Sequence, residues 1–340
     1  MQRKYELDMC RICASLMVVV LHISGSGWYI DPSLFEWKII NIFDMGMRAA
    51  VPLFFMISGT LLLSHEFFSI KRFIVRNTVR LIIIYSVWSI IYELNTHFFY
   101  QTYTHIFDFW GGVIKGHYHL WFLQTILLAY LFIPIMYNTI HEKKCSQYIL
   151  FLFLIFVIFK NNLLIFSESK LIKDICNKID LSAISYFGYM VLGYILSQKN
   201  YQRTAKKVLP FLTLFIYLFT TALSSYANLC HSLKKGEATE WLYGYFSFPV
   251  FIQACCIFVF FQCFSNIKIK HPKIIIYLSD CTLGIYLLHP LILEFFIQHG
   301  FSVSNYNPLI AIPCIFIIIL SICFLITTIF KIIPLVKKII

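Results

Sequence analysis

The sequence predicts an all-α, polytopic integral membrane protein of about ten transmembrane helices, with both termini in the cytoplasm. Of its 340 residues, 59% are apolar and only 13% are charged, whereas soluble domains are about half apolar and a quarter charged. Apolar runs such as residues 81–84 and 315–319 do not alternate with polar residues, which argues against a membrane β-barrel. Neither a repeat nor a low-complexity linker divides the chain, so we expect a single transmembrane domain over residues 1–340.

Ten apolar segments can cross a membrane, and each is expected to be a helix because backbone groups in lipid must bond internally. Several are shorter than the usual ~20 residues and are expected to tilt or to extend into their flanks. The first follows Arg3 and Lys4 as a signal peptide would, but no small-x-small cleavage site follows, so we expect it to be retained. The predicted segments are 9–27, 49–64, 79–95, 118–137, 147–166, 183–198, 209–226, 247–265, 280–297 and 308–330.

The Lys and Arg residues set the predicted orientation. With the N-terminus inside, 19 of the 28 lie on the cytoplasmic side and nine lie outside, which fits the positive-inside rule. The exception is the loop at residues 160–182, whose four lysines are placed outside. The nine outer residues are Lys38, Arg48, Lys115, Lys160, Lys170, Lys173, Lys178, Lys234 and Lys235.

The net charge of +12 and the 11 cysteines do not indicate a nucleic-acid or zinc protein. The basic residues fall between apolar runs and form no single basic face, so we interpret them as cytoplasmic loop charge. Most cysteines lie inside apolar segments, where the residue behaves as a small hydrophobe. Cys10 and Cys13 form one CxxC pair without a second pair or a suitably spaced His, so we expect packing rather than metal binding.

The first segment carries ionisable residues, which are costly to place in a membrane and therefore indicate a specific role. Arg11 and His22 are eleven residues apart, which at about 100° per residue puts both on one helix face, roughly 16 Å apart along the axis. Asp8 can pair with Arg11 at i,i+3. One interpretation is an interfacial ion pair and a core histidine. The other is that Arg11 binds an anionic group or holds a catalytic partner, and that His22 is a general base.

Two further stretches suggest helix contacts and phosphate binding. Pro52, Ser58 and Gly59 permit a break or a close helix contact in the second segment. After it, Arg72, Arg76 and Arg80 fall at i, i+4 and i+8, which predicts a stripe on one helix face. The stripe is either positive-inside charge against anionic lipid or a clamp for a phosphate-rich donor such as an acyl-CoA. The chain has neither a GxxxxGK[ST] loop nor a GxGxxG motif, so ATP and dinucleotides are not indicated.

Histidines and aromatic residues gather at the predicted outer side. Residues 116–122 include His117, His119 and Trp121, which suit either an interfacial aromatic belt or a sugar-facing rim. No metal is proposed, because these histidines lack i,i+4 spacing and no HExxH motif is present. In the ninth segment, His289 lies mid-membrane before Pro290, and Glu294 follows. Ser279 and Asp280 are candidate caps for that helix.

The pattern of these residues resembles the acyltransferase 3 family of bacterial membrane acyltransferases, from the first segment to the ninth. The stretches at 51–59 and 118–122 most resemble the enterobacterial-common-antigen O-acetyltransferase group. Many members have a tighter arginine cluster than Arg76, Asn77 and Arg80 provide. The matching features are Leu7-Asp8-x-x-Arg11, the ten residues between Arg11 and His22, Phe54-Phe55-x-x-Ser58-Gly59 and Gly284-Ile285-Tyr286-x-x-His289.

The resemblance implies ten core helices, an acyl-CoA donor on the cytoplasmic side, and acylation of a surface glycan or its lipid-linked precursor. It implies that Arg11 and His22 are essential. Our hypothesis is an O-acyltransferase of the bacterial cytoplasmic (inner) membrane, in the first place an acetyl-CoA-dependent O-acetyltransferase of polysaccharide biosynthesis. Its expected residues are His22, Arg11 and Asp8 for catalysis, Arg72, Arg76, Arg80 and Ser58 for the donor, and His119, Trp121 and His289 for the acceptor.

The alternative hypothesis is a membrane carrier that exports polysaccharide intermediates without acyl-transfer chemistry. Transfer of labelled acetyl from acetyl-CoA to a glycan distinguishes an enzyme from a carrier. A purely structural membrane subunit leaves the ionisable face of the first helix unexplained. Succinyl transfer would need an extra cation near the acyl group, which the sequence does not specify.

Overall fold

A computed structural model describes residues 3–64, 69–100, 106–178, 182–199, 201, 208–265, 267, 269–334 and 336–340. Every regular element within these ranges is a helix, which confirms the all-α prediction. The first part contains α1 (Tyr5–Gly25), α2 (Phe35–Met47), α3 (Ala50–Leu63), α4 (Ile70–Phe73), η1 (Ile74–Thr78), α5 (Val79–Tyr100), α6 (Ile106–Lys115), α7 (Trp121–His141) and α8 (Lys143–Phe153). The second part contains η2 (Leu154–Phe159), α9 (Lys160–Phe166), α10 (Lys170–Lys178), α11 (Ser182–Ser197), α13 (Val208–Lys235), α14 (Phe248–Gln262), α15 (Pro272–Gln298), η3 (Val303–Asn305), α16 (Pro308–Ile332) and η4 (Val336–Lys338).

Eight helical stretches among the described residues are long and apolar enough to cross a membrane. They confirm a polytopic membrane protein, and all ten predicted segments coincide with helices. Two of the ten do not belong to these eight stretches and are short, because α11 has 16 residues and α14 has 15. The number of ten crossings and the cytoplasmic termini therefore remain predictions.

Three predicted boundaries differ from the structure. The stretch before the second segment contains α2, and α2 with α3 forms one apolar helical stretch over Phe35–Leu63. The loop predicted at 160–182 is largely α9 and α10 in its described part. Helix α15 begins at Pro272, so Ser279 and Asp280 lie inside it, and their prediction as caps is wrong. Proline at the first helical position explains the early start, because its missing N–H would be unpaired there anyway.

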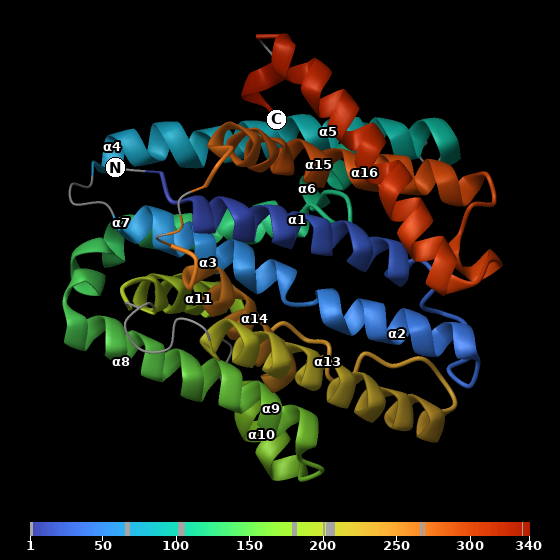
Figure 1. Cartoon of the computed structure of the whole chain (residues 1–340), viewed down its shortest axis with the longest axis horizontal. Coiled ribbons are helices and arrows are strands. Elements are labelled where there is room, and N and C mark those ends of the chain that lie inside the picture. The colour runs from blue at the N-terminus through green and yellow to red at the C-terminus, as the bar shows by residue number, and fades with distance from the viewer. Residues whose placement is uncertain are drawn as a thin grey trace.

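Helix α1 lies in the middle of the bundle and packs against α2, α3, α14, α15 and α16. Figure 1 shows α2 and α3 following one another end to end beside α1, with α15 on the opposite side. Twelve side chains of α1 are buried, which explains why this helix is apolar on nearly all sides.

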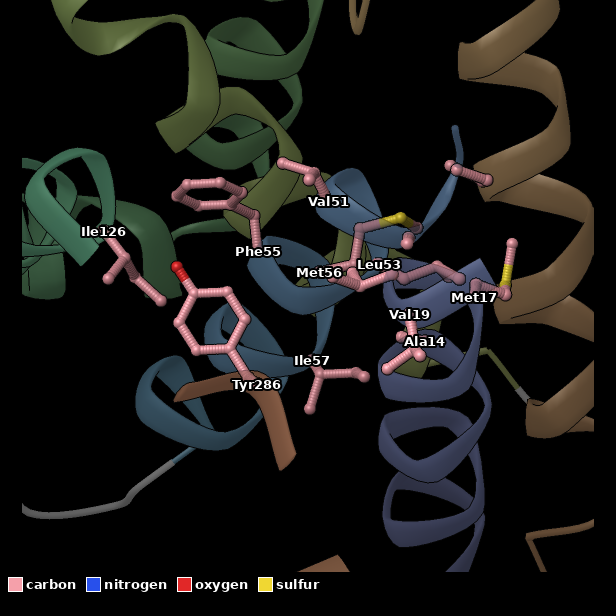
Figure 2. Close-up of a cluster of buried hydrophobic side chains, with 14 of the residues drawn as sticks. Ala14, Met17, Val19, Val51, Leu53, Phe55, Met56, Ile57, Ile126 and Tyr286 are labelled. Atoms are coloured by element: carbon pink, nitrogen blue, oxygen red, sulfur yellow. The ribbon is translucent and has the colours of Figure 1, made fainter. Parts of the chain in front are cut away.

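The core beside α1 is a cluster of closely packed apolar side chains. Figure 2 shows Ala14, Met17 and Val19 of α1 against Leu53 and Met56 of α3. Tyr286 of α15 and Ile126 of α7 border the same cluster, so four helices meet there. This packing holds α1 and α15 rigidly while leaving their polar faces to meet each other.

Two glycines bring α3 and α11 into direct backbone contact. A Cβ on Gly59 would lie 2.1 Å from the carbonyl oxygen of Met190, and a Cβ on Gly193 would lie 2.2 Å from that of Met56. Both distances are far inside van der Waals contact. The close helix contact expected at Gly59 is thus confirmed, and it is reciprocal.

We predict that Gly193→Leu destabilises the fold, because neither backbone can move away without unpacking the bundle. Overpacking costs about 1–3 kcal/mol, and a drop of about 1–4 °C in the melting temperature of the detergent-solubilised protein is expected. Gly111→Leu on α6 is the control, because a Cβ there meets no described atom within 4 Å. Equal melting temperatures for the two variants would contradict this contact.

Candidate functional site

Helices α1 and α15 run parallel and touch through a regular series of polar contacts. Arg11 Nη1 donates to Ser279 Oγ at 3.4 Å, and Ser15 Oγ donates to the Thr282 carbonyl at 3.4 Å. Farther along, His22 Nδ1 lies 2.7 Å from His289 Nε2. The contacts share a sequence offset of 267 or 268 residues, so one register holds over the whole pair. Arg11 and His22 therefore face the same partner helix, as their spacing predicted.

The first end of this pair carries a cluster of charges around Asp8. Arg3 Nε lies 2.7 Å from Asp8 Oδ2, and Ser279 Oγ donates to Asp8 Oδ1 at 2.7 Å. The predicted pair of Asp8 and Arg11 exists, but its atoms are 3.7 Å apart. Arg3 also reaches Asp280 at 3.0 Å. The hydrogen bond to Asp8 raises the pKa of Arg3, so Arg3 stays charged. The sequence did not identify Arg3, because its partners come from another turn and another helix.

The second end of the pair is a hydrogen-bonded histidine pair with a defined proton arrangement. His289 is fully buried, and its Nδ1 lies 3.0 Å from the carbonyl oxygen of Ile285. A carbonyl only accepts, so Nδ1 of His289 carries the proton and Nε2 carries a lone pair. Nδ1 of His22 must then donate to that lone pair. For two neutral rings, this leaves Nε2 of His22 unprotonated, which is the form that a general base needs.

Three more ionisable side chains form a chain beside this pair. His117 Nε2 lies 3.0 Å from Glu294 Oε1, and His117 Nδ1 lies 3.0 Å from His119 Nδ1. His119 is buried, and its Nε2 has no hydrogen-bond partner among the described residues. The His119 ring lies 6.0 Å from the His289 ring, edge-on. The structure thus gathers His22, His289 and His119 into one cluster.

Aromatic residues hold this cluster, but the predicted Trp121 is not among them. The Tyr92 ring stacks on His117 at 4.3 Å, and the Tyr286 hydroxyl donates to the His119 carbonyl at 2.6 Å. Trp121 instead packs against Tyr186 and Tyr245, with ring distances of 5.9 and 5.4 Å. Its role as an acceptor-binding residue stays a prediction.

A cavity of about 510 Å³ opens beside the first end of the α1–α15 pair. Among the described residues that line it are four cationic side chains and one acidic side chain, Asp280. Ser58 and Tyr286 also line it, and the Tyr286 ring lies 6.2 Å from the ring of His289, three residues farther along α15. The sequence did not single out Lys331, in the last turn of α16, or Lys337, just after this helix, because only the packing of distant segments brings them to the cavity. The four cations are Arg11, Arg80, Lys331 and Lys337.

Of the three arginines predicted as one stripe, Arg80 lines the 510 Å³ cavity, whereas Arg72 and Arg76 are not among its described lining residues. All three side chains are exposed, and Arg80 donates to the main-chain oxygen of Ile340 at 3.4 Å. Arg72 and Arg80 are eight residues apart, which is roughly 12 Å along a helix, so the far end of the stripe lies away from the lining that contains Arg80. A π-helical turn, η1 (Ile74–Thr78), lies between these two residues.

A second cavity of about 410 Å³ adjoins the first. Arg11 and Asp280 line both cavities, and Arg3, Lys4 and Asp8 line the second. Arg11 is therefore the residue of α1 that reaches both spaces. No group of three or more potential metal ligands occurs in the described part of the chain.

A buried ion pair stands near the His22 end of α1. Arg48 lies between α2 and α3, 2.6 Å from Asp44, and its guanidinium sits 4.9 Å above the Tyr243 ring. The exposed Glu240 adds a contact at 3.3 Å. Tyr243 in turn donates to the side chain of Asn41. Asp44 and Arg48 at i,i+4 in an apolar stretch were the available indication, but the predicted segments 9–27 and 49–64 left both residues outside a helix.

Comparison with known proteins identifies one family. A family model described as an acyltransferase domain, that of acyltransferase 3, matches residues 4–328. An amino-acid racemase of Enterococcus faecalis is 22% identical over 353 aligned residues, which cover 94% of this chain. The chain spans 45% of the length of that relative. No solved structure matches the chain.

We predict that Arg48→Ala strongly destabilises the protein, because it leaves Asp44 buried without its cation. Breaking such a pair costs about 3–5 kcal/mol, measured as the free energy of unfolding in mixed detergent micelles. Glu240→Gln, at the exposed side of the same cluster, should cost about 1 kcal/mol or less. Similar losses for both variants would show that burial of Asp44 is not what makes the pair important.

Proposed function

The chain belongs to the acyltransferase 3 family, and we propose that it transfers an acyl group, in the first place acetyl, from an acyl-CoA to a hydroxyl of a cell-surface glycan or of its lipid-linked precursor. Membership makes it a membrane acyltransferase. The donor, the acceptor and the place in the bacterial inner membrane belong to the proposal. Outside α1 and α15, the proposed mechanism uses only residues that line the two cavities or belong to the histidine cluster.

The α1–α15 pair is the observation that carries the proposal. One continuous helix contact joins a cavity lined by cations to a histidine whose Nε2 is free to accept a proton. The two ends lie roughly 16 Å apart along α1, about half a hydrocarbon core. This arrangement suits a phosphate-rich donor at one end and a hydroxyl acceptor at the other.

The cation-lined cavity supports binding of the donor. Coenzyme A carries several phosphate charges, and Arg80, Lys331 and Lys337 of the cavity lining can pair with them. Arg11 lines the same cavity and donates to Ser279 Oγ. From there, a long pantetheine arm would carry the thioester toward Tyr286 and the histidine pair. Orientation of an already activated thioester supplies much of the rate of such a transfer.

The histidine pair supports general-base chemistry. Nε2 of His22 takes the proton of the acceptor hydroxyl as its oxygen bonds to the thioester carbonyl carbon. The C–S bond then breaks, and the coenzyme A thiolate takes up the proton, so the reaction balances. His289 donates to the Ile285 carbonyl and fixes the tautomer of His22 throughout. His119, with its unpartnered Nε2, is the candidate contact for the acceptor.

We predict that His22→Ala abolishes acyl transfer, because a positioned base contributes about 10²–10⁴-fold to rate. The measurement is surface-glycan acetylation by NMR in a strain that lacks the gene and carries each variant at matched protein level. His299→Ala is the control, since His299 is an exposed histidine just after α15. Full acetylation with His22→Ala would exclude this mechanism. Vesicle transport of glycan without acetyl transfer by purified protein would favour the carrier instead.

We predict that Arg80→Ala and Lys337→Ala each raise KM for acetyl-CoA about tenfold while kcat stays within about threefold. A charge-assisted hydrogen bond contributes about 1.5–3 kcal/mol, and tenfold corresponds to about 1.4 kcal/mol. Arg72→Ala should change KM less than about twofold, because Arg72 is exposed and is not among the described residues that line the cavity. A larger effect of Arg72 than of Arg80 would return the donor to the predicted stripe.

A further inference from the structure

Arg11 lies near Asp8 and shares two cavities with Asp280, and both carboxylates affect how an anion can bind to Arg11. Asp8 is 3.7 Å from its Nη1, and Asp280 lines both of the cavities that Arg11 lines. Without another cationic partner, Asp8 would form a close ion pair with Arg11, and the charge of Asp280 would repel an anionic ligand. How these two acids are neutralised therefore decides what Arg11 can bind.

Arg3 satisfies both acids at once. Its Nε lies 2.7 Å from Asp8 Oδ2 and its Nη2 lies 3.3 Å from Asp8 Oδ1, while Nη2 also reaches Asp280 Oδ1 at 3.0 Å. Ser279 Oγ supplies a further donor to Asp8 at 2.7 Å. Both oxygens of Asp8 thus have close donors without Arg11.

Arg11 is correspondingly free. Its contact with Asp8 is longer than a hydrogen bond, and its hydrogen bond to Ser279 Oγ, at 3.4 Å, uses one of the five donors of a guanidinium. The side chain is 29% exposed and lines both cavities. Its remaining donors are available to a ligand in either space.

We propose that Arg3 is a positioning residue for donor binding. It forms ion pairs with Asp8 and Asp280, so that Arg11 can bind an anionic group of the donor. The proposal rests on the proposed function, because it takes the donor to be an acyl-CoA. With Arg3, the cluster of Arg3, Asp8, Arg11 and Asp280 is neutral. Without it, the cluster carries one net negative charge beside the cavity.

The test is direct binding to the purified full-length protein, by calorimetry in detergent, with acetyl-CoA and with inorganic pyrophosphate as probes. Arg3→Ala should weaken acetyl-CoA binding about tenfold, and Arg3→Lys should keep most of it. Adding Asp280→Asn to Arg3→Ala should restore binding to within about threefold of wild type, because it removes the net negative charge that Arg3→Ala leaves, while Ser279 still donates to Asp8. Lys144→Ala, an exposed cation at the start of α8, is the control and should change nothing.

The double variant separates this role from a tether between α1 and α15. If Arg3 only tied the helices together, Asp280→Asn would leave binding as weak as in Arg3→Ala or weaker, and the proposal would be overturned. Equal affinity of Arg3→Ala and wild type would also overturn it. Lack of acetyl-CoA binding by wild type would contradict the proposed function, and the same variant ratios measured with pyrophosphate would still decide the role of Arg3. Binding of neither probe would overturn both.

Discussion

The parallel contact between α1 and α15 is the constraint on which the rest of the site depends. A polar face inside a membrane bundle is costly unless another element satisfies it. Each helix therefore satisfies the other: the charges around Asp8 meet Ser279 and Asp280, and His22 meets His289. Because the register is the same at both ends, a shift of one turn would disrupt the ion pairs and the histidine pair together. The apolar packing of α1 against α3 resists such a shift from the other side.

Local periodicity predicted the part of this arrangement that lies within one helix. Composition and hydropathy were enough for an all-α membrane protein, and a period of 3.6 residues was enough to put Arg11 and His22 on one face. The helix that packs against Arg11 and His22 could not be predicted from periodicity. His289 was noticed as an unusual residue, but its 2.7 Å contact with His22 joins positions 267 residues apart. Arg3, Lys331 and Lys337 enter the site for the same non-local reason.

Axial position and helix boundaries limited the prediction elsewhere. The arginine stripe was predicted from angular spacing alone, but Arg72 and Arg80 are roughly 12 Å apart along the helix, and of the three arginines Arg80 is the one in the described lining of the larger cavity. Asp280 next to an apolar run suggested a cap, but the helix starts eight residues earlier at Pro272. In each case the residue types are sensible for the predicted role, and the position along the helix differs from the predicted one.

Separation of charge explains why the two ends of the pair can coexist. A cation close to an imidazole opposes its protonation, by about 4 kcal/mol at 4 Å with an effective dielectric constant of 20. At roughly 16 Å the same interaction falls to about 1 kcal/mol. A cavity with four cations placed directly beside His22 would therefore prevent it from acting as a base. Three helical turns between Arg11 and His22 let one helix hold an anionic donor and still present a histidine that can take a proton.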